Sequence, residues 1–190
     1  MVIKNHTKDI YGKKNLRYSP ILAEMLENCA SYYPNLSIQN GLRPEHLGES
    51  FTKIYNQIYE ERKTIPKSNP LNGSYKLMLN GSYGKSNEDT SFFYDPMFTM
   101  SITINGQLLL MMLSEKLTLS IKDLTVLQIN TDGITIKVHE IYYDKVKEVC
   151  KWWMELTKLE LEEVHYSKMI IRDVNYLRLN LSNCRKLLRA

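Results

Sequence analysis

The fold is decided by the stretch Leu124–Val138, which reads LTVLQINTDGITIKV. Two runs rich in β-branched residues, Leu124–Ile129 and Ile134–Val138, flank the segment Asn130–Gly133. The Asp-Gly pair in that segment suits a tight turn, so the stretch predicts a β-hairpin. Taken alone, an Asp-Gly turn is also an ordinary way to join two strands and implies no function.

The sequence around this hairpin changes from helix-forming to strand-forming along the chain. Helix-forming residues or helical spacing predict helices at Ser19–Glu27, Gly48–Lys63, Leu71–Tyr83, Met97–Leu119 and Tyr142–Lys158. Short alternating runs predict strands at Leu161–Tyr166, Lys168–Asp173 and Tyr176–Leu179. Because no regular βαβ repeat is present, this order indicates the α+β class with an antiparallel sheet.

Two of the predicted helices are joined by a proline turn, and a third is unusually apolar. The turn Ile65–Pro70 separates Gly48–Lys63 from Leu71–Tyr83, so we expect an antiparallel helix pair. The segment Ser31–Asn35 contains Pro34 and is expected to end the first predicted helix. The helix Met97–Leu119 is apolar on most of its surface and is expected to be buried.

Composition bounds the class of protein without naming it. The chain has 190 residues, 43% of them hydrophobic and 24% charged, which is typical of a folded domain with a core. A net charge of +4 permits contact with a polyanion but does not establish one. The cysteines at positions 29, 150 and 184 lack metal-binding spacing and are expected to be reduced thiols. No uninterrupted apolar run approaches 18 residues, so we expect a soluble protein of the cytoplasm that contacts no membrane.

The segment Lys76–Gly84 presents an unusual set of side chains on one helical face. Lys76, Asn80, and Tyr83 with Gly84 are spaced so that they lie on the same side of a helix. They offer a cation, an amide, a phenol and a glycine that permits close approach to the backbone. The same spacing also fits a surface helix that ends in glycine. The alternative is a helix that holds a triphosphate through Lys76 and supports a base pair against Tyr83 and Gly84.

This Lys-x-x-x-Asn followed by Tyr-Gly resembles the fingers motif of family B DNA polymerases. Family members usually have Ser directly after the Asn, where this chain has Gly81. The resemblance implies that Lys76 contacts the incoming triphosphate and protonates the departing pyrophosphate. It extends over roughly Ser31 to Asn180 and is most similar to bacteriophage enzymes of the family.

The hairpin tip resembles the catalytic hairpin of the same family, which reads Asp-Thr-Asp-Ser. By the resemblance, Asp132 binds two catalytic Mg²⁺ ions, which Mn²⁺ can replace, and Asn130 occupies the position of the first Asp. The third metal-binding position of the family falls on Asn28, where an amide replaces a carboxylate. That loss is expected to cost on the order of a thousandfold in rate. The strand that carries this position in the family falls where a helix is predicted here, at Ser19–Glu27, so we expect the strand to be replaced or lost.

The run Ser31-Tyr32-Tyr33-Pro34 resembles the Ser-Leu-Tyr-Pro part of another family motif. The resemblance implies that Ser31 and Tyr32 donate backbone N–H groups to the β- and γ-phosphates. It also implies that Tyr33 crowds the sugar 2′ position and excludes ribonucleotides. Without the other motifs, a simple Tyr-Pro turn would explain this run equally well.

Weaker similarities concern basic residues and the end of the sheet. Arg62 and Lys63 resemble basic residues that reach the triphosphate, although basic residues at a helix C-terminus are common. Arg172 and Tyr176 resemble positions where contacts with the primer strand of DNA begin. The function implied is addition of deoxynucleotides to a primer on a DNA template.

The resemblance divides the chain into parts and implies that it is incomplete. The expected parts are a basic arm (1–18), a partial palm (19–47), fingers helices (48–84), a palm with the catalytic hairpin (85–180) and a tail (181–190). Exonuclease and thumb would be separate chains, and a phage protein would act in the host cytoplasm. A catalytically silent remnant or a non-catalytic DNA-binding module remains the alternative. An RNA-directed polymerase also uses an acidic hairpin, but that family lacks the face formed by Lys76–Gly84.

Overall fold

The computed structural model describes the backbone of residues 22–27, 31–171 and 176–180, and the side chains of residues 31–163. The predicted basic arm, Asn28, Arg172 and the tail therefore lie outside the described residues. The elements are β1 (Leu22–Glu27), α1 (Tyr32–Gln39), η1 (Glu45–Leu47), α2 (Gly48–Thr64), α3 (Pro70–Gly84), α4 (Pro96–Ser120), β2 (Thr125–Ile129), β3 (Ile134–Val138), η2 (Glu140–Tyr142), α5 (Tyr143–Thr157), β4 (Glu162–Ile171) and β5 (Tyr176–Asn180).

The strands form one five-stranded sheet in the order β2-β3-β1-β4-β5, and every neighbouring pair is antiparallel. The predicted hairpin is β2–β3, in which Ile129 lies opposite Ile134. The turn is closed by a hydrogen bond from the backbone N–H of Asn130 to the carbonyl of Gly133, at 2.7 Å. The α+β class with an antiparallel sheet is thus confirmed.

β1 corrects the prediction of a helix at Ser19–Glu27. Residues Leu22–Glu27 form the central strand, with β3 on one side and β4 on the other. Leu, Ala, Glu and Met all favour helices, but this preference amounts to only a few tenths of a kcal/mol per residue. Pairing with strands on both sides overrides it. The expected loss of the strand before Ser31 was therefore wrong.

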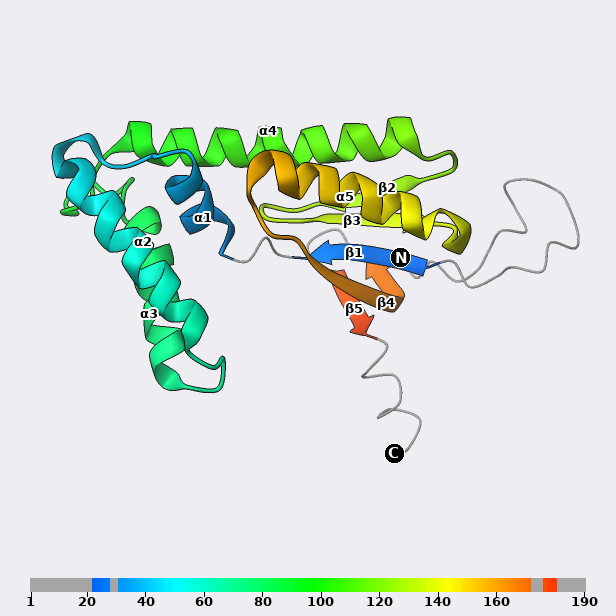
Figure 1. Cartoon of the computed structure of the whole chain (residues 1–190), viewed down its shortest axis with the longest axis horizontal. Coiled ribbons are helices and arrows are strands. Elements are labelled where there is room, and N and C mark those ends of the chain that lie inside the picture. The colour runs from blue at the N-terminus through cyan, green and yellow to red at the C-terminus, as the bar shows by residue number, and fades with distance from the viewer. Residues whose placement is uncertain (1–21, 28–30, 172–175, 181–190) are drawn as a thin grey trace, which may run out of the picture.

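Helices α4 and α5 pack against each other and cover one face of the sheet (Figure 1). Trp153 of α5 is fully buried, and its indole N–H donates to the carbonyl of Leu109 in α4 at 2.8 Å. Ile134 and Ile136 of β3 belong to the same core cluster. The helix predicted at Tyr142–Lys158 is confirmed as α5.

α4 confirms the predicted helix at Met97–Leu119 but corrects its expected burial. One face is buried, whereas the opposite face carries exposed apolar residues. These residues are Met97, Met100, Ile104, Leu108, Met111 and Leu119. By length and composition α4 is the one helix in the described part of the chain that is apolar enough to cross a membrane, a property that core helices share.

The predicted antiparallel helix pair is present as α2 and α3, which project from one end of α4 (Figure 1). Two contacts show the antiparallel register. The Tyr55 hydroxyl donates to the Leu79 carbonyl at 2.5 Å, and nearer the turn the Tyr75 hydroxyl donates to Glu61 at 3.1 Å. Asn69 caps α3 by accepting from the backbone N–H of Leu71 at 3.0 Å.

The segment Ser31–Asn35 was expected to end a helix, but helix α1 begins there. Pro34 lies in the first turn of α1, where a missing N–H costs no helical hydrogen bond. Tyr32 fixes this helix to α4, because its hydroxyl donates to the carbonyl of Gly106 at 2.6 Å. Residues 40–44 form the loop that follows α1.

The two strands expected at Leu161–Tyr166 and Lys168–Asp173 are one strand, β4. Its pairing with β5 shifts register between Tyr166 and Lys168, which is where the sequence pattern appeared to stop. A bulge of this kind changes the alternation without ending a strand. Positions 172 and 173 lie outside the described residues.

Candidate functional site

A pocket with a volume of about 940 Å³ opens between the helical hairpin and the sheet. Four parts of the chain surround it: the start of α1, the facing sides of α2 and α3, the tip of the β2–β3 hairpin, and the segment that leads into β4. The lining residues are Ser31, Tyr32, Tyr33, Tyr59, Arg62, Lys63, Ile65, Lys67, Asn72, Gly73, Lys76, Asn80, Tyr83, Gly84, Asp132, Glu160 and Glu162.

Most of the site residues predicted from the sequence meet in this pocket. Those that line it are Ser31, Tyr32, Tyr33, Arg62, Lys63, Lys76, Asn80, Tyr83, Gly84 and Asp132. Asn130 lies in the hairpin turn and is not part of the lining. The backbone of Tyr176 lies in β5, while Asn28 and Arg172 are outside the described residues. The individual roles of all these residues stay predictions.

Stacked tyrosines join α1 to α3 at one side of the pocket. The rings of Tyr33 and Tyr83 have centroids 4.5 Å apart and planes 21° apart. The Tyr83 hydroxyl also shares a hydrogen bond with Thr103 of α4 at 2.8 Å. Burial raises the pKa of the Tyr33 phenol, and the neighbouring Tyr83 and Asp132 raise it further. Tyr33 therefore stays a neutral hydroxyl beside the hairpin tip at physiological pH.

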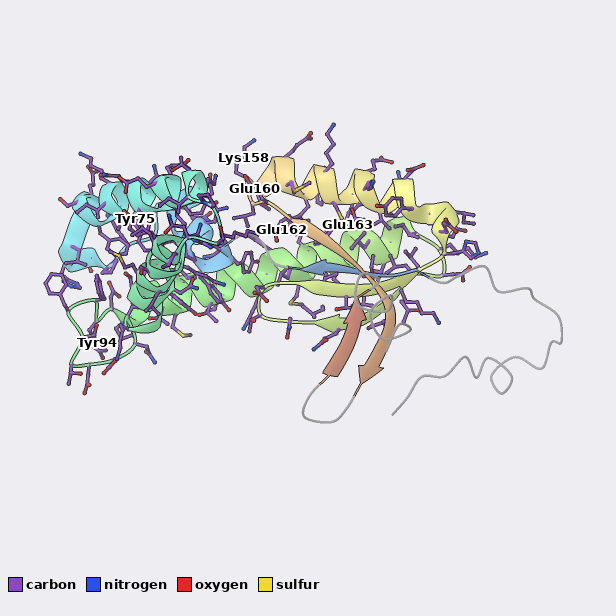
Figure 2. The ribbon with its side chains drawn as sticks, turned by 90° about the horizontal axis from the view of Figure 1, so that it is seen from below. Tyr75, Tyr94, Lys158, Glu160, Glu162 and Glu163 are labelled. Carbon is purple, nitrogen blue, oxygen red and sulfur yellow. The ribbon has the colours of Figure 1, made fainter. Side chains whose placement is uncertain are left out.

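Basic residues on the helical side differ in whether an acid neutralises them. Nζ of Lys63 lies 3.8 Å from Oε1 of Glu160, and Nζ of Lys67 lies 3.7 Å from Oε1 of Glu162. Figure 2 labels Glu160, on the segment between α5 and β4, and Glu162, the first residue of β4. Within the described part of the chain, Arg62 and Lys76 have no carboxylate partner.

The donor set limits what metal the pocket can hold. Among the described residues, no group of three or more His, Cys, Asp or Glu side chains gathers around one point. Asp132 is half-buried at the pocket wall and accepts a long hydrogen bond from the Thr131 hydroxyl at 3.5 Å. Magnesium often binds through one or two carboxylates together with substrate phosphates. The lining therefore fits an ion that arrives with a polyphosphate better than a metal caged by protein alone.

Several lining residues were missed by sequence reasoning. Asn72 lies one helical turn before Lys76, so extending the spacing of the Lys76 face backwards would have included it. Glu160 and Glu162 alternate along the segment entering β4, but nothing in their local pattern indicates an approach to α2. Lys67 lies in the hairpin turn, where exposed lysines are ordinary.

Comparison with solved structures finds a similar fold in a DNA polymerase. The chain is similar to the family B DNA polymerase from the hyperthermophilic archaeon Pyrobaculum calidifontis, with a TM-score of 0.57 and 15% sequence identity. The match covers 89% of this chain and 29% of the polymerase chain. No protein-family model and no curated protein matches the sequence.

This likeness shows the fold. It agrees with the predicted palm-type antiparallel sheet carrying a short two-helix insertion. The chain spans less than a third of the polymerase that it matches, so the activity of the whole enzyme does not transfer with the fold.

Proposed function

We propose that this chain is the nucleotide-binding and primer-extending part of a family B DNA polymerase of bacteriophage type. The observation that carries the proposal is the meeting of three sequence segments in one pocket. The Ser31–Tyr33 run, the Lys76–Gly84 face and the Asp132 turn are far apart in the sequence, yet all border it. Such convergence is not expected of three motifs that match by chance.

The charges of the pocket support a polyanionic ligand. Arg62 and Lys76 line it without a carboxylate partner in the described residues, so a triphosphate would supply the missing negative charge. Backbone N–H groups at the start of α1 can add to this, because Ser31 is the N-cap and Tyr32 the first residue of this eight-residue helix. The ligand proposed is a deoxynucleoside triphosphate.

The aromatic side of the pocket supports recognition of the sugar and base. The Tyr33–Tyr83 stack presents a flat surface next to Gly84, where a base pair can approach closely. Tyr33 is held by this stack, so its phenol can crowd a 2′-hydroxyl and disfavour ribonucleotides. Asn80, one turn from Lys76 on α3, can orient the nucleotide by hydrogen bonding.

Asp132 is the residue proposed to hold Mg²⁺ or Mn²⁺, with Asn130 and Asn28 as weaker oxygen donors. Bound ions would neutralise phosphate charge and favour attack of the primer hydroxyl on the α-phosphorus. Lys76 would donate a proton to the departing pyrophosphate. Arg172 and Tyr176 are proposed to contact the primer strand of the DNA.

The proposed partners are primer–template DNA and separate exonuclease and thumb chains in the host cytoplasm. The exposed apolar face of α4 favours contact with another protein chain. A second candidate function is a silent remnant that binds DNA without synthesis. The amides at positions 28 and 130, where the family motif has carboxylates, favour that candidate.

Single-nucleotide primer extension with Mg²⁺ and with Mn²⁺ tests the proposal. The variants are Asp132→Ala, Asn28→Asp, and the control Asp89→Ala, which removes an exposed carboxylate that does not line the pocket. We expect extension by the unaltered chain, a loss on the order of a thousandfold in Asp132→Ala, and no loss in the control. Asn28→Asp should extend faster than the unaltered chain.

Two results would count against an active polymerase. If extension begins only in Asn28→Asp, the chain is a silenced polymerase fragment whose pocket is intact. If no variant extends a primer while DNA binding persists and ignores magnesium, the non-catalytic module is the better description. In that case binding should weaken steeply with salt, because phosphate contacts alone would carry it.

A further inference from the structure

A buried amide lies where the two helices of the hairpin meet. Asn72, in the first turn of α3, is only 8% exposed. Its Nδ2 donates to the carbonyl of Ile65 at 2.7 Å and to the carbonyl of Arg62 at 3.2 Å. Its Oδ1 accepts from Nε of Arg62 at 3.2 Å. One side chain therefore holds both the main chain and the guanidinium of Arg62.

The guanidinium is fixed a second time by Ser31. Nη1 of Arg62 donates to the Ser31 hydroxyl, and Ser31 has left-handed backbone angles, with φ 52° and ψ 58°. All three side chains line the pocket. Bonds at Nε and Nη1 set the plane of the guanidinium, and its remaining N–H groups stay available for the oxygens of a ligand.

We propose that Asn72 is a positioning residue for triphosphate recognition, which acts by aiming the Arg62 guanidinium into the pocket. This inference rests on the proposed nucleotide site and adds a residue that the sequence motifs do not include. An arginine held in place before the ligand arrives loses less rotamer freedom on binding than a mobile one. The competing explanation is that Asn72 only caps the end of α2 and secures the turn.

The Asn72–Arg62 link makes a quantitative prediction for binding. Affinity for Mg²⁺-dATP and for inorganic tripolyphosphate would be measured by titration calorimetry on the unaltered chain, Asn72→Ala, Arg62→Ala and the double variant. Each single change should weaken binding about tenfold, as expected when a charge-assisted contact is weakened. The double variant should bind no more weakly than Arg62→Ala, because Asn72 acts through that arginine.

A control separates positioning from general stability of the hairpin. Tyr55→Phe removes another hydrogen bond between α2 and α3, the one to Leu79, and Tyr55 does not line the pocket. It should lower the unfolding midpoint while leaving both affinities unchanged. Asn72→Ser is the second variant if Asn72→Ala does not fold. Its short hydroxyl does not span both carbonyls, so it should lose affinity in the same direction.

The outcomes distinguish the inference from the function on which it rests. An unaltered chain that binds neither probe overturns both. Normal binding that Arg62→Ala weakens but the Asn72 variants leave unchanged overturns the inference alone. The same holds if the losses add in the double variant, or if Tyr55→Phe weakens binding as much as Asn72→Ala does.

Discussion

Among the residues whose side chains the structure describes, Arg62 and Lys76 on the helical side of the pocket have no carboxylate partner, whereas the sheet side carries Asp132, Glu160 and Glu162. On the helical side, the Arg62 guanidinium is held by hydrogen bonds to Asn72 of α3 and to Ser31 at the start of α1. At the hairpin tip the sheet side has one carboxylate, Asp132, two residues after the amide of Asn130. Under the proposed function, nucleotide binding would depend on the helical side and catalysis on the sheet side, so variants of one side should separate the two.

The largest effect on binding is expected from Lys76→Ala, which removes a cation from the helical side. Affinity for Mg²⁺-dATP should fall by about 10- to 100-fold, the range for one charge-assisted hydrogen bond to phosphate. Lys53→Ala is the matched control, since Lys53 is exposed on α2 and does not line the pocket. Equal losses of affinity in the two variants would mean that the net charge of the protein, rather than the helical side of the pocket, attracts the nucleotide.

Much of the fold could be predicted from periodicity, but pairing partners could not. The helices α2 to α5 and the β2–β3 hairpin follow local spacing, so the predictions for them succeed within one or two residues. The prediction for β1 was wrong because Leu22–Glu27 has helix-forming side chains. Pairing with the strands on either side makes this segment a strand. Local sequence does not encode those neighbours.

The site shows the same division between local and distant information. The spacing of Lys76, Asn80 and Tyr83 on one helix face was predictable, because helical geometry alone determines it. The approach of Glu160 to Lys63 was not, because it depends on how α5 delivers the chain to β4. The exposed face of α4 was also missed, since apolar composition does not say which face finds a partner.

An intermediate effect, on stability, is expected from Gly106→Ala, which tests the packing of α1 against α4. A methyl group there would lie 3.1 Å from a ring carbon of Tyr32 and 3.2 Å from a methyl of Leu36. Helix α1 must then shift, at a cost of about 1–3 kcal/mol in the free energy of unfolding, measured with urea. The matched control is Gly81→Ala on α3, where the added methyl meets nothing within 4 Å.

The two glycine variants should change stability in opposite directions. Alanine at position 81 relieves the entropic penalty of glycine in a helix and should stabilise the chain by roughly 0.5–1 kcal/mol. Because Tyr33 follows Tyr32 directly, Gly106→Ala should also disturb the Tyr33–Tyr83 stack and weaken dATP more than tripolyphosphate. If both ligands weaken equally, α1 supports the phosphates rather than the base.

The smallest effect is expected from Glu162→Gln, which removes a carboxylate from the sheet side. The Glu162–Lys67 pair is exposed, with 52% and 87% of the side-chain surface accessible, so losing it should change stability little. Release of Lys67 should raise the affinity for Mg²⁺-free tripolyphosphate about two- to fivefold at low salt, and the gain should shrink as salt screens it. Glu155→Gln is the control, because Glu155 pairs with Lys151 on α5 and does not line the pocket.

If Glu162→Gln instead weakens binding only when Mg²⁺ is present, the carboxylate holds the cation that accompanies the nucleotide. The acidic wall would then share in binding, and the separation of the two sides would fail.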